Sequence, residues 1–559
     1  MTWIARGTSE GIRSPSRAGV PDADREALER RAVRRWAAAL VLLCLGALWL
    51  EFRHIERTMP YPRHVDEGFI AGPARIMLQT GSLHPQTFNY PSLPKYLTAA
   101  GMAVGFLRGA SQLEVREIRY LGNMNYPHYD TRVMQTARQL FAALSVLALA
   151  ATGFSAWLAF RQPIAILLAP LILLTSPLFF FHSWTYLNVD IVGTSFVMLT
   201  LAACLHGIRR LTVTHSAVVP ALFAGLATGS KYTLALVALP ILSAVGLYFT
   251  AGRRIWAWTT ALLTTGAAFL VAVPFSVIDI PAFLDGVASE AFHYASGHRG
   301  FNGEPGLDQF LYYMRHFASE FRVTGAIVAG LGLAAYAVAD WRRAIVLAVF
   351  PAGLLWLLSS QRVHFPRNVL SLHPFVAMFA ACGLIQLYGW TLRLTARWGR
   401  QQTRRSTRVV VALALLLATV PLWNLADHVR DRTDSRNLAQ TWIEEHLSTD
   451  WTIVIPTELA FDKRGLEASG RRVVVLDFQP ARDAVALSSL LSGVRSPAVV
   501  MVPRWGADAR YSGQKLAETL NEASRSRQAL ERFGTNDVLV NYSYSTPWGD
   551  PAFAIAVLR

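Results

Sequence analysis

The chain has 559 residues, of which 53% are hydrophobic and only 16% are charged, and its mean hydropathy is +0.31. Soluble domains carry about 25% charged residues, so this composition excludes an ordinary soluble protein and indicates an integral membrane protein. The net charge of +16 comes from arginine, because the sequence has only four lysines. The arginines cluster between apolar segments, as in cytoplasmic loops of membrane proteins, and therefore do not indicate nucleic-acid binding.

Residues 1–35 are rich in Arg, Ala and Ser and lack the apolar core of a signal peptide, so we expect a disordered cytoplasmic tail. The first span is predicted at about 36–52, as an uncleaved anchor. Arginines at 30, 31, 34 and 35 precede it, which places the N-terminus in the cytoplasm by the positive-inside rule. The three cysteines lie within apolar segments and indicate no disulfide framework.

The apolar segment 93–107 is too short for a span, which needs roughly twenty residues, so we expect a juxtamembrane helix on the outer surface. The later spans are predicted at 133–158, 163–181, 188–207, 216–229, 232–250, 255–275, 323–340, 344–359, 368–391 and 409–425. With these eleven spans, every tight arginine cluster from Arg161 to Arg408 lies inside, whereas a span at 93–107 would place them all outside. The connections 182–190, 229–232, 276–322 and 361–368 then lie outside, beside the first loop.

From about residue 427 the composition becomes that of a soluble domain. Strand-like segments lie at 451–456, 472–478, 498–502, 537–542 and 553–558, and helical patterns lie at 435–447, 481–493 and 511–532. This alternation predicts a small α/β domain, which the parity of the spans places on the outer face. The predicted division is a tail at 1–35, a transmembrane domain at 36–426 and an extracytoplasmic domain at 427–559. The last has no phosphate-binding loop or nucleophile elbow, so we interpret it as an accessory or acceptor-handling domain.

Carboxylates stand at two of the outer connections. Asp66 and Glu67 follow the first span, and Asp190 begins a later one. Acids in the first turn of a helix are often only favourable to the helix dipole, and Asn188 and Asp190 would also suit a helix cap. Carboxylates beside lipid are nevertheless costly unless they are paired or used. Together on one face, they predict a site that accepts a proton or, if any metal is bound, holds a divalent cation through Asp66 and Asp190.

Basic side chains gather on the same predicted face. Lys95 and Lys231 are two of the four lysines; snorkelling to lipid headgroups is the alternative explanation for each. Arg362, His364 and Arg367 form a cluster outside the membrane, against the positive-inside trend. A site for a phosphate or an anionic headgroup would explain this exception, because arginine matches phosphate oxygens in pairs.

The predicted outer connection 276–322 is long, and long loops in compact proteins are usually functional lids or disordered. It carries Glu290, His293, Tyr294 and His298 among several glycines. Two histidines five residues apart are weak evidence for a metal. Contact of His293, Tyr294 and His298 with substrate and a surface loop without ligands both stay open.

Taken in order, these motifs resemble the membrane-embedded polyprenyl-phosphate-dependent glycosyltransferases of the GT-C fold, in particular protein mannosyltransferases and bacterial lipid A aminoarabinose transferases. Asp66-Glu67 is similar to the acidic motif of their first loop, and Asp190 to their second acidic position. Segments 227–232 and 367–374 are similar to recurring segments of the bacterial members. The resemblance covers about residues 36–425. The sequence departs from it at Ser92, where many members have proline, and in having no basic residue directly after Glu67.

The resemblance implies an inverting transfer of a sugar from a polyprenyl-phosphate donor to an acceptor hydroxyl, on the outer face of the plasma membrane. The acceptor would be a glycan, a lipid or a protein. Asp66 is then the expected general base, with Glu67 and Asp190 as further catalytic candidates. Lys95, Lys231, Arg362, His364 and Arg367 are the expected ligands of the donor phosphate, where cations would stabilise the departing charge. The resemblance establishes no cofactor, and it leaves open whether a divalent metal ion takes part.

Two other classes of function remain open. A secondary transporter or lipid flippase would place ionisable residues deep within its spans and would often show an internal repeat. The predicted spans carry few charges, and no repeat is evident. A non-catalytic assembly or receptor protein would use the outer domain for binding, but it would leave the outward carboxylates without a purpose.

Overall fold

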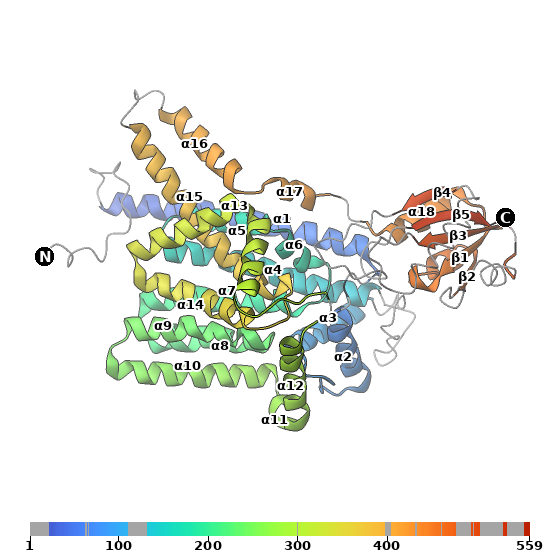
Figure 1. Cartoon of the computed structure of the whole chain (residues 1–559), viewed down its shortest axis with the longest axis horizontal. Coiled ribbons are helices and arrows are strands. Elements are labelled where there is room, and N and C mark those ends of the chain that lie inside the picture. The colour runs from blue at the N-terminus through green and yellow to red at the C-terminus, as the bar shows by residue number, and fades with distance from the viewer. Residues whose placement is uncertain are drawn as a thin grey trace, which may run out of the picture.

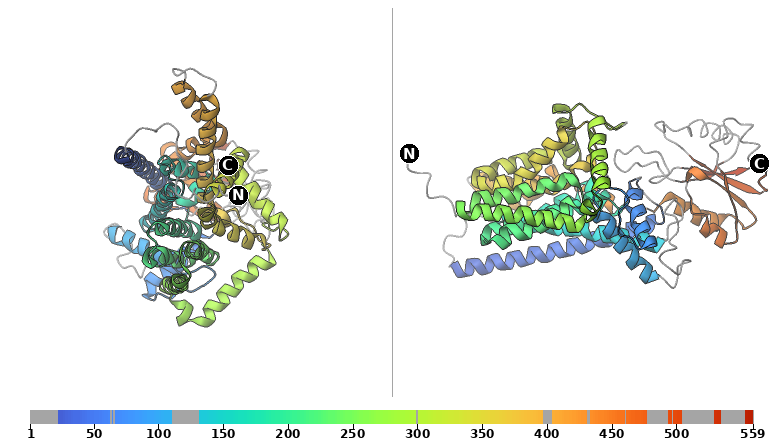
Figure 2. Two further views of the ribbon diagram at one scale, coloured as in Figure 1. Left: turned by 90° about the vertical axis from the view of Figure 1, so that its left-hand side faces the viewer. Right: turned by 90° about the horizontal axis from the view of Figure 1, so that it is seen from below.

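The computed structural model describes residues 22–61, 64, 66–109, 131–298, 300–396, 404–430, 433–459, 461–476, 493–495, 497–503, 529–533 and 553–558. These residues form a bundle of long helices and, at the end of the chain, a small sheet (Figure 1). Most bundle helices run nearly parallel or antiparallel to one another, and the two further views agree (Figure 2).

The long helices of the bundle are α1 (Asp22–Thr58), α4 (Thr131–Phe160), α7 (Val189–Arg210), α10 (Ala251–Ala272), α13 (Leu307–Ala339), α14 (Trp341–Ser359) and α15 (His373–Ala396). Seven helices of the described part, with α15 counted together with the 3₁₀ turn η6 (Pro366–Leu372), are long and apolar enough to span a membrane. An eighth span is possible if α5 (Ala165–Leu174) and α6 (Pro177–Trp184), which are bent by 80° at their junction, cross together.

Three shorter apolar segments complete the set. They are η4 with α8 (Thr214–Val218, Val219–Thr228), η5 with α9 (Tyr232–Val237, Ala238–Tyr248) and α16 (Arg404–Thr419). Each of the eleven predicted spans falls on one of these helices or helix pairs. Helix α3 (Leu93–Gly109) is not among the candidate spans, in agreement with its interpretation as a juxtamembrane helix.

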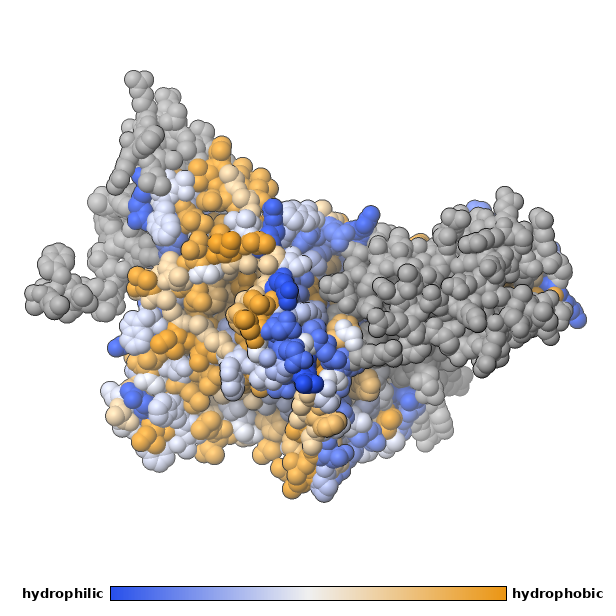
Figure 3. Space-filling view, viewed as in Figure 1, coloured by the Kyte–Doolittle hydropathy of each residue, from blue (hydrophilic) through white to orange (hydrophobic). Residues whose placement is uncertain are grey.

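The outer surface of the bundle is apolar, as lipid contact requires. Large apolar side chains on its helices are well exposed, including Leu42, Val338 and Trp356. Figure 3 shows hydrophobic residues over much of the visible bundle, with hydrophilic residues gathered toward the end that faces the sheet. Exposed apolar area of this extent is unusual on a soluble monomer. The chain is therefore an integral membrane protein, as the composition predicts.

Two predictions about segments outside the spans are wrong. Helix α1 begins at Asp22, so residues 22–35 are helical and do not belong to a disordered tail; residues 1–21 lie outside the described part. The predicted loop 276–322 is largely helical, with α11 (Phe275–Ile278), α12 (Ile280–Ser296) and the first half of α13. Pro281 in the first turn of α12 and the Asp279 side chain, which caps its N-terminus, start that helix.

The C-terminal sheet has the strand order β2-β1-β3-β5-β4. Strands β1 (Thr452–Pro456), β2 (Arg472–Leu476) and β3 (Ala498–Pro503) are parallel, whereas β4 (Ala529–Phe533) and β5 (Phe553–Leu558) are antiparallel neighbours. Helices α18 (Ser435–His446) and α19 (Arg464–Ala468) accompany it. The α/β prediction is confirmed. The helix predicted at 511–532 is wrong at its end, which is strand β4; its residues 511–528 lie outside the described part. The helix predicted at 481–493 lies outside it except for Gly493, and the strand predicted at 537–542 lies wholly outside it.

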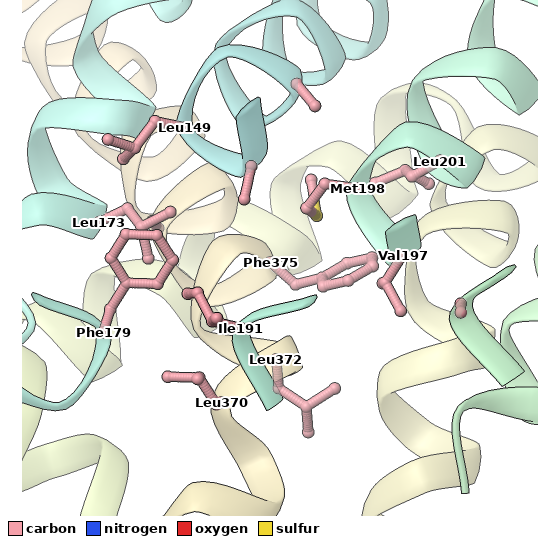
Figure 4. Packing of buried hydrophobic residues seen from close by; sticks show 14 of the residues in the cluster. Leu149, Leu173, Phe179, Ile191, Val197, Met198, Leu201, Leu370, Leu372 and Phe375 are labelled. Atoms are coloured by element: carbon pink, nitrogen blue, oxygen red, sulfur yellow. The ribbon is translucent and has the colours of Figure 1, made fainter. Parts of the chain in front are cut away.

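The hydrophobic core of the bundle lies directly beneath the polar end. Figure 4 shows Ile191 of α7 packed near Phe179 of α6 and near Leu370 and Leu372 of η6. Ile191 directly follows Asp190 in the sequence, and Leu370 and Leu372 follow shortly after Arg367. The packing of the core therefore fixes the starts of α7 and η6, and with them the side chains described next.

Candidate active site

Asp66 stands at the N-cap position of α2 (Glu67–Thr80), but its side chain makes no capping hydrogen bond. Its carboxylate forms an ion pair with Arg367, with 2.7 Å between Oδ2 and Nη2. The backbone N–H of Asp66 donates to His64 Nδ1 at 3.1 Å, and the His64 ring stacks on Tyr186. The helix-start explanation for Asp66 therefore fails for its side chain, which is used to hold an arginine.

Asp190 forms a second ion pair, with Lys231, at 2.7 Å between Oδ1 and Nζ. Asn188 caps α7, because its side-chain oxygen accepts the N–H of Ile191 at 2.8 Å, and this sets Asp190 in the first turn. Lys231 lies in extended backbone just before η5. Burial acts to lower the pKa of Lys231, but the attraction of Asp190 outweighs it and raises the pKa, so the lysine is charged.

Asn368 joins the two ion pairs into one cluster. It follows Arg367 in η6, and its side-chain oxygen accepts from Lys231 Nζ at 3.0 Å and from the Tyr294 hydroxyl at 3.0 Å. The pairs Asp66–Arg367 and Asp190–Lys231 therefore meet at one place, although they come from four distant segments of the chain. We call these five residues, Asp66, Asp190, Lys231, Arg367 and Asn368, the charged cluster.

Glu67 lies behind the charged cluster and is fully buried. Its carboxylate receives two hydrogen bonds from Arg138 of α4, at 2.8 and 2.7 Å, and a third from the N–H of Leu187 at 3.2 Å. Arg138 also donates to the carbonyl of Tyr61 at 3.1 Å. All these contacts tie the acidic loop to α4 and to the segment before α7, so Glu67 is placed to position Asp66.

Lys95 does not join the charged cluster. Its side chain is buried and donates to the carbonyl and the hydroxyl of Thr87, the latter at 3.0 Å, and to the carbonyl of Pro85. Burial lowers the pKa of Lys95 to about 7. Lys95 thus closes the 85–87 turn onto the start of α3.

Arg362 and His364 also lie apart from the charged cluster. Arg362 is exposed, and His364 stacks on Tyr312 and bonds to the side chain of Gln309 at 3.0 Å. Of the three basic residues predicted in this connection, the structure brings Arg367 alone into contact with Asp66.

A cavity of about 220 Å³ lies beside the charged cluster. One wall is α12, which presents Val287, Glu290, Ala291 and Tyr294, at helical spacing. Its remaining lining residues are Asn89, Tyr90, Pro91, Lys231, Tyr232, Thr233, Leu357, Leu358 and Gln361. The cavity surface is mostly apolar and carries three tyrosines, with a few polar groups from Asn89, Lys231, Glu290 and Gln361, as in many small-molecule sites.

The residues predicted on the 276–322 segment lie at the rim of this site. Tyr294 lines the cavity and bonds to Asn368. The rings of His293 and His298 lie 5.2 Å apart, and Arg367 lowers the pKa of both after the larger effect of burial. Both histidines therefore lie within electrostatic reach of the charged cluster, although neither makes a hydrogen bond to it.

The donor set does not fit a metal ion. Asp66 and Asp190 are each bonded to a cationic side chain, and the described residues contain no group of three His, Cys, Asp or Glu side chains that could hold one. Divalent cations take several oxygen ligands, which two already paired carboxylates do not supply. We therefore derive no step through a metal.

Three residues of this site were missed from the sequence. Asn368 is next to the predicted Arg367, and Tyr90 lies in the segment before Lys95. Arg138 lies within the predicted span 133–158, where a lone arginine is costly and should have indicated a buried acidic partner.

No protein-family model matches this sequence, and no curated protein matches it. Its structure is similar to that of ArnT from Cupriavidus metallidurans in the apo state (TM-score 0.47, 14% identity, covering 93% of this chain and 98% of that one). The same protein bound to undecaprenyl phosphate matches at TM-score 0.47 and 15% identity, over the same 93% and 98%. The apo oligosaccharyltransferase of Archaeoglobus fulgidus matches at TM-score 0.44 and 11% identity, over 82% of this chain and 69% of that one. At these scores the likeness carries no argument about activity, which we take from the site itself.

Proposed function

We propose that this protein is a glycosyltransferase that moves a sugar from a polyprenyl-phosphate donor to an acceptor hydroxyl on the outer face of the membrane. One observation carries the proposal: the two acidic motifs of the resemblance meet, each paired with a cation, beside a tyrosine-lined cavity at one end of the bundle.

The chemistry follows from the charges. The acceptor oxygen attacks the anomeric carbon as the bond from that carbon to the phosphate oxygen breaks, so the sugar is inverted and the lipid phosphate leaves with the bonding electrons. Negative charge grows on the phosphate, and the cations available to stabilise it are Lys231, which lines the cavity, and Arg367, which lies within electrostatic reach of Glu290 in the cavity wall. Asp66, Asp190 and Asn368 hold these two cations in place before the substrate arrives. The hydroxyl proton must pass to a carboxylate of the site.

The arginine distribution supports the outer location. Arg161 follows α4, Arg209 ends α7 and Arg343 lies at the start of α14, so these clusters lie at the bundle end opposite the starts of α7 and η6. Arg209 is within electrostatic reach of Arg343 and of Glu29, near the start of α1. If this basic end is cytoplasmic, the charged cluster is extracytoplasmic.

A second candidate, a transporter or flippase, has one observation in its favour. Two helices bury a carboxylate whose partners in the described part of the chain are serine or backbone groups: Glu51 bonds to Ser145, and Glu320 bonds to Ser176 and to the N–H of Leu178. Such groups within spans are typical of proton-coupled transporters.

The decisive assay uses membranes that contain the full chain and a panel of radiolabelled polyprenyl-phosphate hexoses and pentoses. Transfer would appear as release of polyprenyl phosphate together with labelled product. We expect Asp190→Asn to slow this release about a hundredfold or more, because Lys231 loses its partner. Movement of a labelled sugar or lipid across sealed vesicles, without release of polyprenyl phosphate from any donor, would instead establish the second candidate.

Orientation can be tested separately. Glu304→Cys places a thiol on an exposed position after α12, and Arg342→Cys places one at the basic end of α14. The three native cysteines are buried, so they give a low background. In intact cells a membrane-impermeant maleimide should label the first variant and leave the second unlabelled; the reverse pattern would contradict the outer location.

A further inference from the structure

Two carboxylates belong to the charged cluster and a third lies beside it, and the three differ in their partners. Asp66 is bonded to Arg367 and Asp190 to Lys231. Glu290 of α12 lines the cavity but forms no hydrogen bond or ion pair with another residue of the described part. It lies within electrostatic reach of Lys231, Arg367 and Asp66 without touching any of them. Glu290 is therefore the carboxylate of this site that is not already used.

A general base has to gain a proton during the reaction, and this condition separates the three. A proton on Asp66 would cancel the charge that holds Arg367, and a proton on Asp190 would do the same to Lys231. Both cations are largely buried, and a buried charge that loses its partner is strongly destabilising. The loss would also come when both cations are needed to stabilise the departing phosphate. A proton on Glu290 breaks no such pair.

The position of Glu290 suits this role. It lies between Val287 and Tyr294 on the face of α12 that forms the cavity wall, whereas Phe292 on the opposite face of the helix is exposed. Backbone N–H groups of Arg362 and Val363 bond to the carbonyl of Tyr294 and tie the end of α12 to the rest of the site. The carboxylate is thus held at the wall of the cavity in which a hydroxylated substrate would lie.

We propose that Glu290 is the general base that accepts the proton of the acceptor hydroxyl, and that Asp66 instead positions Arg367. This inference rests on the proposed glycosyl transfer. As the acceptor oxygen bonds to the anomeric carbon, its proton passes to the Glu290 carboxylate, and the carbon–oxygen bond to the lipid phosphate breaks with its electrons on the phosphate. The reaction balances without a further reagent.

The electrostatic surroundings agree with this role. Burial raises the pKa of Glu290, Lys231 and Arg367 oppose the shift, and Asp66 adds to it. The tyrosines 90, 232 and 294 also face Glu290, and burial raises the pKa of each, so they stay neutral. A base with a raised pKa accepts a proton more readily near neutral pH. Transfer should therefore fall as the pH is lowered through the pKa of Glu290.

The test compares Glu290→Gln, Glu290→Asp and Asp285→Asn in membranes that contain the full chain. Asp285 is exposed on the same helix and is the matched control. The readout is release of polyprenyl phosphate from the donor that the wild type uses, measured from pH 4.5 to 8. We expect Glu290→Gln to lower kcat by about 10²–10⁴-fold, with little change in the donor KM and without the acidic fall of the pH profile. Glu290→Asp should recover part of the rate, and Asp285→Asn should match the wild type.

The outcomes are distinct. If Glu290→Gln turns over within threefold of the wild type and keeps the acidic fall of the profile, Glu290 is not the base, although the glycosyltransferase proposal stands. A rise in donor KM at unchanged kcat would equally overturn the assignment, since it indicates binding alone. If the wild type releases polyprenyl phosphate from no donor, both proposals fail. Because Glu290 has no partner in the described part, its variants should melt like the wild type, and this check separates catalysis from misfolding.

Discussion

The buried pair of Arg138 and Glu67 gives the sharpest test of how the site is held. Arg138→Met removes the two hydrogen bonds to Glu67 and the one to the Tyr61 carbonyl, and leaves the buried Glu67 carboxylate with the N–H of Leu187 but without its arginine. The two side chains are 1% and 0% exposed, so solvent does not weaken the effect. Breaking such a pair by removing one partner costs about 3–5 kcal/mol, a large share of a net stability of about 5–15 kcal/mol.

The assay is the apparent melting temperature of the purified protein in detergent, at one heating rate for all variants because unfolding of membrane proteins is usually irreversible. At roughly 2 °C per kcal/mol for a large chain, we expect Arg138→Met to melt about 6–10 °C below the wild type. The double variant Glu67→Gln/Arg138→Met should melt above the single one, since it leaves no buried charge. Arg315→Met, on an exposed arginine, is the control. Two results would contradict this explanation. The single variant could melt within 2 °C of the wild type, or the double variant could melt at or below the temperature of the single variant. Either result would show that an unpaired buried charge does not determine the loss of stability.

Three further predictions follow from the same contacts. Asp190→Asn should lower sugar transfer about a hundredfold or more while the exposed Glu304→Gln has no effect, as measured by release of polyprenyl phosphate. The pKa of Lys95 is lowered from 10.5 to about 7, so between pH 7 and pH 10.5 the folded state binds fewer protons than the unfolded state, and stability rises with pH. The melting temperature of the wild type should therefore rise over this pH range, and that of Lys95→Met should not. An equal rise in both proteins would contradict the prediction. Arg436 lies over the ring of Tyr61, with 3.8 Å between its Cζ atom and the ring centroid. Arg436→Met should therefore lower both the melting temperature and the transfer rate. A lower melting temperature at an unchanged transfer rate would show that this contact does not affect the site.

The helical architecture could be predicted because its signal is local. Apolar length, positive-inside parity and the alternation of strands and helices each depend on a short window of sequence. These local signals do not identify helices that lack a long continuous apolar segment. Helix α12 is amphipathic and shorter than a membrane span, and glycines follow it, so the sequence pattern of 276–322 predicts a loop, whereas most of the segment is helical. The extension of α1 back to Asp22 is polar and was missed for the same reason.

The site was predicted in part, for a different reason. Asp66, Asp190, Lys231 and Arg367 were identified by type and by predicted face, and the structure brings these four together. No local pattern states which acid meets which base, because pairing depends on how four segments fold. By residue type and predicted face, Lys95 belongs with the expected ligands of the donor phosphate. In the structure its side chain instead donates to the carbonyls of Pro85 and Thr87.

The C-terminal domain contacts the segment that leads into the acidic loop, through the side chain of Tyr61. Its Asp434 and Arg436 form a buried ion pair, and Arg436 covers the ring of Tyr61, whose hydroxyl also accepts the N–H of Asp462. The carbonyl of Tyr61 in turn accepts from Arg138, which holds Glu67 next to Asp66. A displacement of the domain would therefore reach the acidic loop through side chains that are almost fully buried and cannot relax into solvent. The sequence predicts an accessory domain, and these contacts connect that domain to the loop that carries Asp66.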